Sequence, residues 1–351
     1  MRPYFEKMPG FGKPLKENRI ARSQESRAKL EAIEAEIAAL RKVRENVGIP
    51  AAKINERGSM TIWQRLEYLV DPGTWQPLHS LYNPEENEEG TTNVVDGLGK
   101  IAGRWAVIIG FDNKVLAGAW IAGQPENILR VTNLAKRLNI PLVWLVNCSG
   151  VKLPDQEQFY AGRRSSGTPF FRHAELEQAG IPVLAGIYGT NPAGGGYQGI
   201  TPTILIAHKD ANIAVGGAGI VSGMSPRGGF DAEGLEQLIT VTRDLKERPP
   251  GSVDTHYNTT GFFTHVCDEE KGVLDGIKTY MKAIPAYDPM FFRVAEPAEP
   301  VLPSGDLYHL LPVNQKETYV LEDILARLVD GSEHMEFRPT YGPEIYTGLV
   351  K

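Results

Sequence analysis

One stretch, IPVLAGIYGTNPAGGGYQG at residues 181–199, limits what this chain can fold into more than any other. An apolar, β-branched run ends in a turn at residues 189–192, and three glycines, Gly194 to Gly196, follow almost directly. This pattern is typical of a buried strand that delivers bare backbone to one point. Because glycines have no Cβ atoms, a ligand can approach the amide N–H groups, and these point outward if a helix starts there.

Composition and charge exclude several classes of protein. The 351 residues are 42% hydrophobic, which is enough to bury a full core, and the formal net charge is −6. Acidic and basic residues are interspersed, so no basic surface for nucleic acid is indicated. No apolar run approaches the roughly 20 residues of a membrane span, and the N-terminus lacks the apolar core of a signal peptide. Cys148 and Cys267 alone provide neither a zinc cluster nor a disulfide framework. We therefore expect a globular, cytoplasmic protein without a metal site.

The spacing of apolar residues predicts an α/β protein preceded by a helical arm. Residues 23–47 read as an amphipathic helix that docks on the protein body, with a coiled-coil seam as the alternative, and residues 62–70 as a second helix. Two strands then precede the first helix, so we expect strand-strand-helix repeats rather than a doubly wound sheet. The expected strands are 94–95, 105–111, 115–122, 142–147, 183–188, 203–207 and 213–215, and the expected helices are 124–138, 171–179 and 232–245.

The opening of this domain recurs near the C-terminus. LEYLVDPGTWQPLH at residues 66–79 precedes VVDGLGK at 94–100, and LARLVDGSEHMEFRP at 325–339 precedes EIYTGLVK at 344–351. A helix, a Val-Asp turn and a strand entering Gly-Leu follow in the same order, which favours a duplicated domain. We therefore expect one complete domain followed by the opening of a second.

A dinucleotide-binding loop is the first alternative for the glycines, because Gly194, Gly196 and Gly199 satisfy G-x-G-x-x-G. Such a fold needs a helix of about three turns between this loop and the next strand. Pro202 and the strand expected from residue 203 arrive almost at once, which leaves no room for that helix. We therefore reject a nicotinamide or flavin site.

No side chain is marked as a nucleophile or metal ligand. Ser149 lacks the flanking glycines of the G-x-S-x-G elbow. His173, His208, His256 and His265 are scattered without metal-ligand spacing, so structural or surface roles are the expectation for each. Catalysis, if present, must then rest on the backbone.

Two backbone turns remain, each at the carboxyl end of an apolar strand: residues 148–151 and residues 193–196. In strand-strand-helix folds, neighbouring strand ends can direct one N–H from each turn at a common oxygen, which makes an oxyanion hole. Loss of one such donor typically costs on the order of 3 kcal/mol of transition-state stabilisation. The alternative that both turns serve only tight packing stays open at this point.

These residues resemble the biotin-dependent acyl-CoA carboxyltransferases, which have the crotonase fold. The resemblance extends through nearly the whole chain and is most specific in NCSGVKLPDQEQF, in GTPFFRHAELEQAGIPVLAGIYGTNPAGGGYQ and in the repeated opening. The chain is most similar to the alpha-type subunits that act on glutaconyl-CoA. It departs from acetyl- and propionyl-CoA carboxylases, in which a second glycine and Ala-Arg would replace Val151 and Lys152.

The resemblance implies a crotonase-like α/β fold in three parts: a helical arm at residues 1–60, an acyl-CoA carboxyltransferase N-terminal domain at 61–313, and the incomplete start of a C-terminal domain at 314–351. Carried over residue by residue, it assigns the thioester oxygen to the backbone N–H groups of Val151 and Gly195. It places Gly150, Gly194 and Gly196 at the substrate, the last two as clearance.

The implied function is transfer of the carboxyl group of glutaconyl-CoA to protein-bound biotin, giving crotonyl-CoA, within a sodium-pumping decarboxylase. Biotin is expected on a separate carrier protein, because Met281-Lys282-Ala283 lacks the second methionine of a biotinylation site. Membrane decarboxylase subunits and a second copy of the chain are the other expected partners, so the location is cytoplasmic or peripheral to the membrane. Since this chain carries the acyl-CoA half, full turnover is expected to be absent or much reduced.

Three alternatives stay open at this stage. The first is a carboxyltransferase acting on another acyl-CoA, of the propionyl- or methylcrotonyl-CoA type. The second is hydration or isomerisation on the same fold, which needs a carboxylate poised near the hole. The third is a non-catalytic assembly module whose arm docks on partners.

Overall fold

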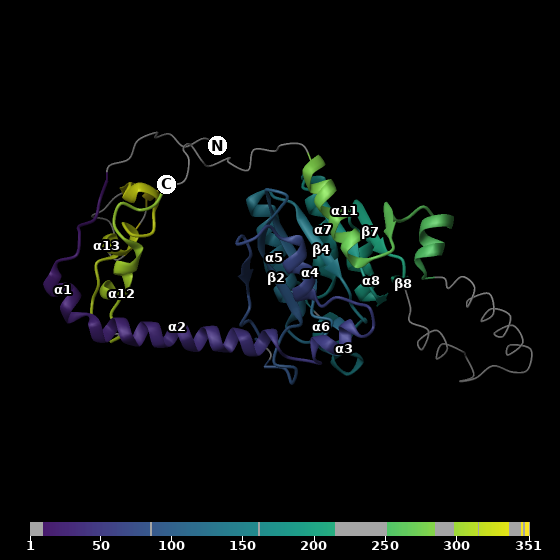
Figure 1. Ribbon diagram of the computed structural model, residues 1–351, viewed down its shortest axis with the longest axis horizontal. Coiled ribbons are helices and arrows are strands. Elements are labelled where there is room, and N and C mark those ends of the chain that lie inside the picture. Colours follow the sequence, from purple (N-terminus) through teal and green to yellow (C-terminus); the bar gives the residue numbers. More distant parts are fainter. Residues whose placement is uncertain are drawn as a thin grey trace, which may run out of the picture. The chain divides into compact units, whose positions relative to one another are not determined.

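The computed structural model describes residues 10–84, 86–160, 162–214, 251–284, 298–314, 316–336, 345–346 and 348–350. The chain divides into two compact units, one of residues 41–286 and one of residues 1–40 with 287–351 (Figure 1). The helix expected at residues 232–245 and the last residue of the strand expected at 213–215 lie outside the described residues.

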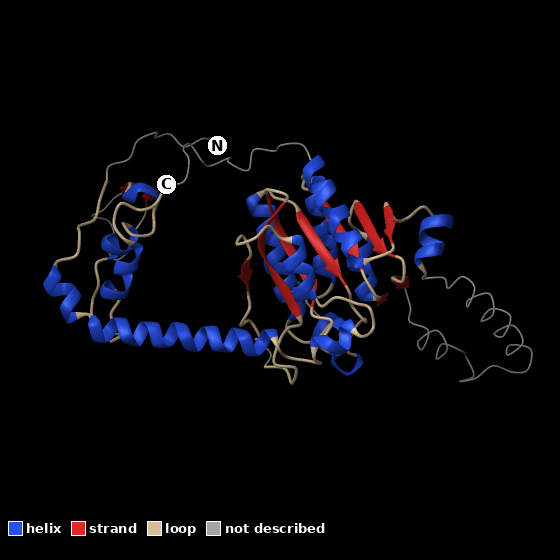
Figure 2. Ribbon diagram, viewed as in Figure 1, coloured by secondary structure: helices blue, strands red, loops and turns tan. Residues whose placement is uncertain are grey.

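A seven-stranded sheet forms the centre of the larger unit (Figure 2). Its order is β1-β2-β3-β4-β5-β7-β9; the first three strands are antiparallel, and every pair from β3 onward is parallel. A separate parallel pair, β6 with β8, follows the carboxyl end of β5. The strands are β1 Gln76–Leu78, β2 Val94–Ile101, β3 Arg104–Phe111, β4 Leu142–Val146, β5 Val183–Ile187, β6 Thr190–Pro192, β7 Ile204–His208, β8 Asn212–Ala214 and β9 His265–Cys267.

Helices cover both faces of this sheet, which is why β4 and β5 are buried along their whole length. Side chains of β4 alternate: Val143 and Leu145 join α4 and α11 in one core cluster, whereas the Trp144 ring lies against Phe111 and His173. Helices α5, α7 and α8 contact the sheet as well. These helices are α4 Ile62–Leu69, α5 Gln124–Leu138, α7 Gly167–Gln178, α8 Gly194–Ile200 and α11 Glu270–Ala283.

The remaining elements are short, apart from the helix of the arm. In order they are α1 Glu17–Arg22, α2 Gln24–Glu45, α3 Ala51–Asn55, a 3₁₀ turn at Leu116–Gly118, another at Leu153–Asp155, α6 Gln156–Tyr160 and a π-helical turn at Thr255–Thr259. The smaller unit adds 3₁₀ turns at Ser304–Asp306 and Asp330–Ser332, helices α12 Leu307–Leu310 and α13 Leu321–Leu325, and strands β10 His334–Glu336 and β11 Gly348–Val350.

Most of the expected elements are confirmed within two residues, and the helix expected at 171–179 begins four residues earlier, but the strand expected at residues 115–122 is wrong. Leu116 and Ala117 have φ values of 46° and 52°, so the chain turns instead of extending. Gly118 shows why: a Cβ there would lie 1.9 Å from the carbonyl oxygen of Asn147. Close approach of this segment to the end of β4 overrides the apolar pattern.

Strand β2 is longer than the two residues expected, because its glycines admit close neighbours. A Cβ on Gly97 would lie 2.4 Å from the carbonyl oxygen of Gln76 in β1, and a Cβ on Gly99 would lie 2.8 Å from Val70. The glycines that obscure the strand pattern in the sequence therefore allow β1 and the end of α4 to pack on β2.

The repeated opening has the same strand register in both copies. When the two Leu-Val-Asp sequences are aligned, Gln76 corresponds to Met335, and the two Gly-Leu sequences align Leu98 with Leu349. In the structure, Gln76 lies opposite Leu98 in the antiparallel pair β1–β2, and Met335 lies opposite Leu349 in the antiparallel pair β10–β11. The sequence repeat therefore corresponds to a repeated backbone pairing.

Candidate functional site

Two turns meet at one edge of the sheet, where β4 and β5 end. The strands are parallel neighbours, with Val146 opposite Ile187, so their carboxyl ends are adjacent. The turn after β4 contains Gly150 at a φ of +95°, and the turn after β5 contains Gly189 at +58°. Parallel strands of an open α/β sheet place ligands at this edge.

Backbone bonds fix the direction of Val151 in the first turn. The N–H of Trp120 donates to the carbonyl oxygen of Gly150 (2.8 Å), and the N–H of Lys152 donates to that of Trp120 (2.9 Å). In this parallel bridge the N–H of Val151 points away from Trp120. That N–H has no hydrogen-bond partner among the described residues.

The second turn passes through Ala193, whose φ of 47° and ψ of −126° are unusual for a residue with a side chain. Its carbonyl oxygen accepts from the N–H groups of Gly196 (2.9 Å) and Tyr197 (3.2 Å). The three glycines lie inside the first turn of α8, which has seven residues, too few for the helix of a dinucleotide fold. The N–H groups of Gly194 and Gly195 are without a partner in the part of the chain that the structure describes.

The three glycines have different surroundings. A Cβ on Gly195 would lie 2.4 Å from the carbonyl oxygen and 2.8 Å from the Sγ of Cys148, and one on Gly196 would lie 2.7 Å from the carbonyl oxygen of Asn191. Packing by itself therefore explains why residues 195 and 196 are glycines. A Cβ on Gly194 would meet nothing nearer than the Cγ2 of Val151, at 3.8 Å. This glycine of α8 therefore lies beside the first turn.

Side chains at the two turns are neutral or already paired. Burial raises the pKa of Cys148 to about 12, so this residue is a thiol at neutral pH. The Ser149 hydroxyl donates to the carbonyl oxygen of Leu116 (2.8 Å). The carboxylates of Glu89 and Asp155 both form ion pairs with the Lys152 ammonium group, at N–O distances of 2.7 and 3.3 Å. The hydrogen bond to Glu89 is the main cause of the raised pKa of Lys152.

The four scattered histidines have structural partners. Burial lowers the pKa of His173 to about 4, and its Nδ1 contacts the hydroxyl of Thr201. The others bond through Nε2: His208 with the carbonyl oxygen of Asp268 (3.1 Å), His256 with that of Ile213 (3.1 Å) and His265 with the hydroxyl of Tyr280 (2.9 Å). No group of three or more His, Cys, Asp or Glu side chains that could hold a metal ion occurs among the described residues.

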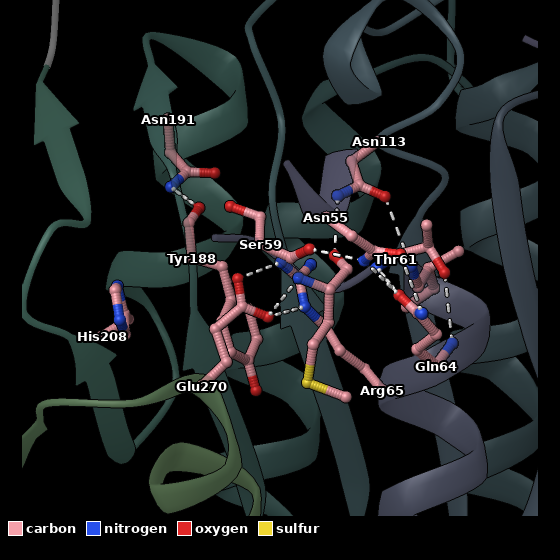
Figure 3. A network of polar contacts seen from close by, with 12 residues as sticks. Asn55, Ser59, Thr61, Gln64, Arg65, Asn113, Tyr188, Asn191, His208 and Glu270 are labelled. Carbon is pink, nitrogen blue, oxygen red and sulfur yellow. Dashed lines mark hydrogen bonds and ion pairs between the residues drawn. The ribbon is translucent and has the colours of Figure 1, made fainter. Parts of the chain in front are cut away.

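A buried polar network lies behind the second turn (Figure 3). The guanidinium of Arg65 on α4 forms two bonds with the Glu270 carboxylate on α11, at 2.8 and 2.9 Å, and lies 3.9 Å from the ring centroid of Tyr188. Asn191 in turn donates to the carbonyl oxygen of Tyr188 (2.8 Å). Sequence reasoning missed these residues; only the Asn-Pro pair at residues 191–192 marked a turn.

Comparison with known families gives a direct match. The family described as "Carboxyl transferase domain" matches residues 53–351, which is most of the chain. The chain belongs to this family. The resemblance drawn from the two turns and the repeated opening is thereby confirmed.

One relative among the curated proteins is the glutaconyl-CoA decarboxylase subunit alpha of Acidaminococcus fermentans, 51% identical over 99% of this chain and 59% of its own length. Another is the biotin-dependent 3-methylcrotonyl-coenzyme A carboxylase beta1 subunit of Mycobacterium tuberculosis, 26% identical over 84% of this chain and 54% of its own. The chain thus spans between half and two thirds of the length of these relatives.

Solved structures of carboxyltransferases share the fold. The beta subunit of geranyl-CoA carboxylase from P. aeruginosa has a TM-score of 0.72 at 20% identity, covering 98% of this chain and 62% of its own. A chain of the transcarboxylase 12S hexamer has a TM-score of 0.58 at 20% identity, covering 90% of this chain and 60% of its own length. The crotonase-like α/β fold is confirmed. No helix in the described ranges has the length and apolar character needed to cross a membrane.

Proposed function

We propose that this chain binds the thioester of an acyl-CoA and acts in carboxyl transfer from glutaconyl-CoA to biotin, which leaves crotonyl-CoA. The observation that carries the proposal is the pair of N–H groups, of Val151 and Gly195 on adjacent turns, that have no partner among the residues the structure describes. Both donate to the thioester oxygen. Gly194 leaves open space beside Val151 for the substrate, and Gly150 and Gly196 shape the two turns.

The chemistry needs charge stabilisation and little else. When the carboxyl group leaves glutaconyl-CoA, the electron pair of the broken C–C bond is delocalised as a dienolate onto the thioester oxygen. Two fixed N–H donors stabilise that developing charge. The dienolate then takes up one proton to give crotonyl-CoA, and the N–H of biotin would release that proton as its nitrogen takes the carboxyl group. The neutral Cys148 adds no competing negative charge, because its thiol stays protonated.

Hydration or isomerisation is less well supported, since both need a free carboxylate base near the hole. Glu89 and Asp155, the carboxylates tied to the residue after Val151, are both paired with Lys152. The Lys152 ammonium group thus holds one oxygen of each carboxylate. This pairing among the described residues supports carboxyl transfer over the other reactions of the fold.

Lys282 does not fit a biotin attachment site. Lys282 lies in the last turn of α11 with Met281 buried in the core, whereas a modified lysine must be presented to an enzyme on an exposed turn. We therefore assign biotin, which supplies the acceptor for the carboxyl group, to a separate carrier protein. Membrane subunits that couple decarboxylation to sodium transport, and a second copy of this chain, are the other proposed partners, from the 51% identity to a glutaconyl-CoA decarboxylase subunit. The location proposed with them is cytoplasmic, at the membrane surface.

We propose the same domain limits that the sequence predicts, near residues 60 and 313. Residues 314–351 would then begin a second crotonase-like domain. The shared register of β1–β2 and β10–β11 supports the duplication. In the first copy Leu69 is fully buried, whereas Leu328, its counterpart, is 58% exposed. Limited proteolysis with mass spectrometry tests the limits, since cuts should gather near these two positions.

Calorimetry with crotonyl-CoA, glutaconyl-CoA and free CoA tests the function. We expect both thioesters to bind more tightly than CoA, because only they offer an oxygen to Val151 and Gly195. Transfer of the carboxyl group to free biotin then tests turnover. No binding of either thioester would favour an assembly module, and tighter binding of propionyl-CoA or methylcrotonyl-CoA would reassign the substrate.

A further inference from the structure

Asn191 belongs to the second turn, and its side chain is fully buried against the first. Its Oδ1 accepts from the N–H of Cys148 in the first turn, at 2.7 Å. Its Nδ2 donates to the carbonyl oxygens of Tyr188 (2.8 Å) and Gly189 (3.2 Å), at the start of the second turn, and to that of Asn212 (3.3 Å) in β8. One amide side chain therefore holds backbone groups of both segments.

The hydrogen bond between the Cys148 N–H and the Asn191 side chain connects the two turns. Among the described residues it is the one hydrogen bond that joins the turn at residues 147–151 to the turn at residues 189–196. Cys148 is also the residue against which Gly195 packs, through its carbonyl oxygen and Sγ. Because bonds to Trp120 tie the residues on either side of Val151, a shift of Cys148 changes the position of Gly195 relative to Val151.

We propose that Asn191 is a positioning residue that sets the separation of the Val151 and Gly195 N–H groups; the inference rests on the thioester-binding function proposed above. Donors in an oxyanion hole must lie about 2.7–3.1 Å from the oxygen they stabilise. A misplacement of about 1 Å can cost on the order of 10²-fold in rate. Asn191 touches no substrate and acts through the backbone alone.

The matched control is Asn113, a second buried asparagine that joins two segments in the same way. Its Oδ1 accepts from the N–H of Ile62 (3.3 Å) and its Nδ2 donates to the carbonyl oxygen of Met60 (2.9 Å), and it is 4% exposed. Both asparagines are seen in Figure 3. Asn113→Ala removes two side-chain bonds, against four for Asn191, without touching either turn.

The experiment is difference infrared spectroscopy of crotonyl-CoA labelled with ¹³C at the thioester carbonyl, bound to the full chain. Two N–H donors lower the stretching frequency of this carbonyl, which reports the hole itself rather than the stability of the fold. We expect the same shift in the wild-type protein and in Asn113→Ala. Asn191→Ala should lose about half of the shift or more, because a displaced donor no longer reaches the oxygen. Asn191→Ser, which keeps a small polar group, serves if the alanine variant does not fold, and should show an intermediate loss.

The outcomes separate the two proposals. An unchanged shift in a folded Asn191 variant overturns the positioning role and leaves the thioester function standing. A wild-type protein that binds crotonyl-CoA without any shift, or does not bind it, overturns the thioester function and the positioning role with it. An equal loss of shift in Asn113→Ala would show that the effect is general destabilisation, which also overturns the proposal.

Discussion

Replacing Gly195 by alanine gives the sharpest test of the proposed hole. The new Cβ would lie 2.4 Å from the carbonyl oxygen of Cys148, whereas ordinary contacts between such atoms lie near 3.4 Å. The first turn of α8 and the turn at Cys148 must therefore separate by about 1 Å, which carries the Gly195 N–H off its target. We expect decarboxylation of glutaconyl-CoA to slow by about 10²–10³-fold, equivalent to about 3–4 kcal/mol of transition-state stabilisation.

Crotonyl-CoA formation with free biotin as acceptor is the assay, and thermal unfolding measures the overpacking, which should cost about 1–3 kcal/mol. Gly194→Ala is the matched control in the neighbouring position. Its Cβ would meet Val151 at 3.8 Å, an ordinary contact. We expect this variant to raise KM by narrowing the site while kcat falls less than about tenfold. A folded Gly195→Ala protein that keeps its rate within about threefold of wild type would refute the donor role.

Three further predictions follow from buried groups. At pH 8 iodoacetamide should label the half-buried Cys267 and spare Cys148, whose pKa of about 12 leaves a thiolate fraction of roughly 10⁻⁴. Glu270→Gln should lower the free energy of unfolding by about 3–5 kcal/mol, because it leaves the Arg65 charge buried and unpaired. Burial raises the pKa of Asp96 to about 6 from an ordinary 3.8, so the folded state holds this proton more tightly than the unfolded state. The stabilisation that this proton provides is full below the ordinary pKa of 3.8 and is lost as the pH rises through 6, so wild type should lose about 3 kcal/mol relative to Asp96→Asn between about pH 3 and 7.

Each of these predictions has a clear contrary result. Mass spectrometry of the labelled native protein showing Cys148 modified as fast as Cys267 would contradict its burial. If urea unfolding gave Glu270→Gln a free energy of unfolding within about 1 kcal/mol of wild type, the Arg65–Glu270 pair would contribute no more than a weak surface pair such as Lys29 with Glu25. A difference between wild type and Asp96→Asn that did not change with pH would exclude titration of Asp96 in this range.

Local signals explain what could be predicted from the sequence. Helix α5 begins after Gly123 and ends before Asn139, and both residues have left-handed backbone conformations that mark its ends. The two turns of the candidate site were predictable because each follows a continuous apolar strand. Strands buried on both faces are typical of parallel sheets, and neighbouring parallel strands have their carboxyl ends at the same edge.

Long-range contacts explain the rest. The positive φ values of Leu116 and Ala117 arise where their segment packs on the end of β4, and no local pattern announces such a contact. The bond between Asn191 and Cys148 joins residues far apart in the chain, and the pair of Arg65 with Glu270 spans most of the larger unit. Sequence reasoning from one chain detects neither, because each side chain is ordinary in its own local context.

The parallel pairing of β4 and β5 has a consequence for how this family of sites can vary. Neighbouring strands lie about 4.8 Å apart, so two amides that leave adjacent strand ends start near the separation that one shared oxygen requires. The hydrogen-bond ladder of the sheet thus sets the approximate separation of the two amides. A hydrogen bond between the turns has only to adjust that separation. If the two amides bind a thioester as proposed, side chains around this edge can be exchanged to admit a different acyl group while the two N–H donors stay in place.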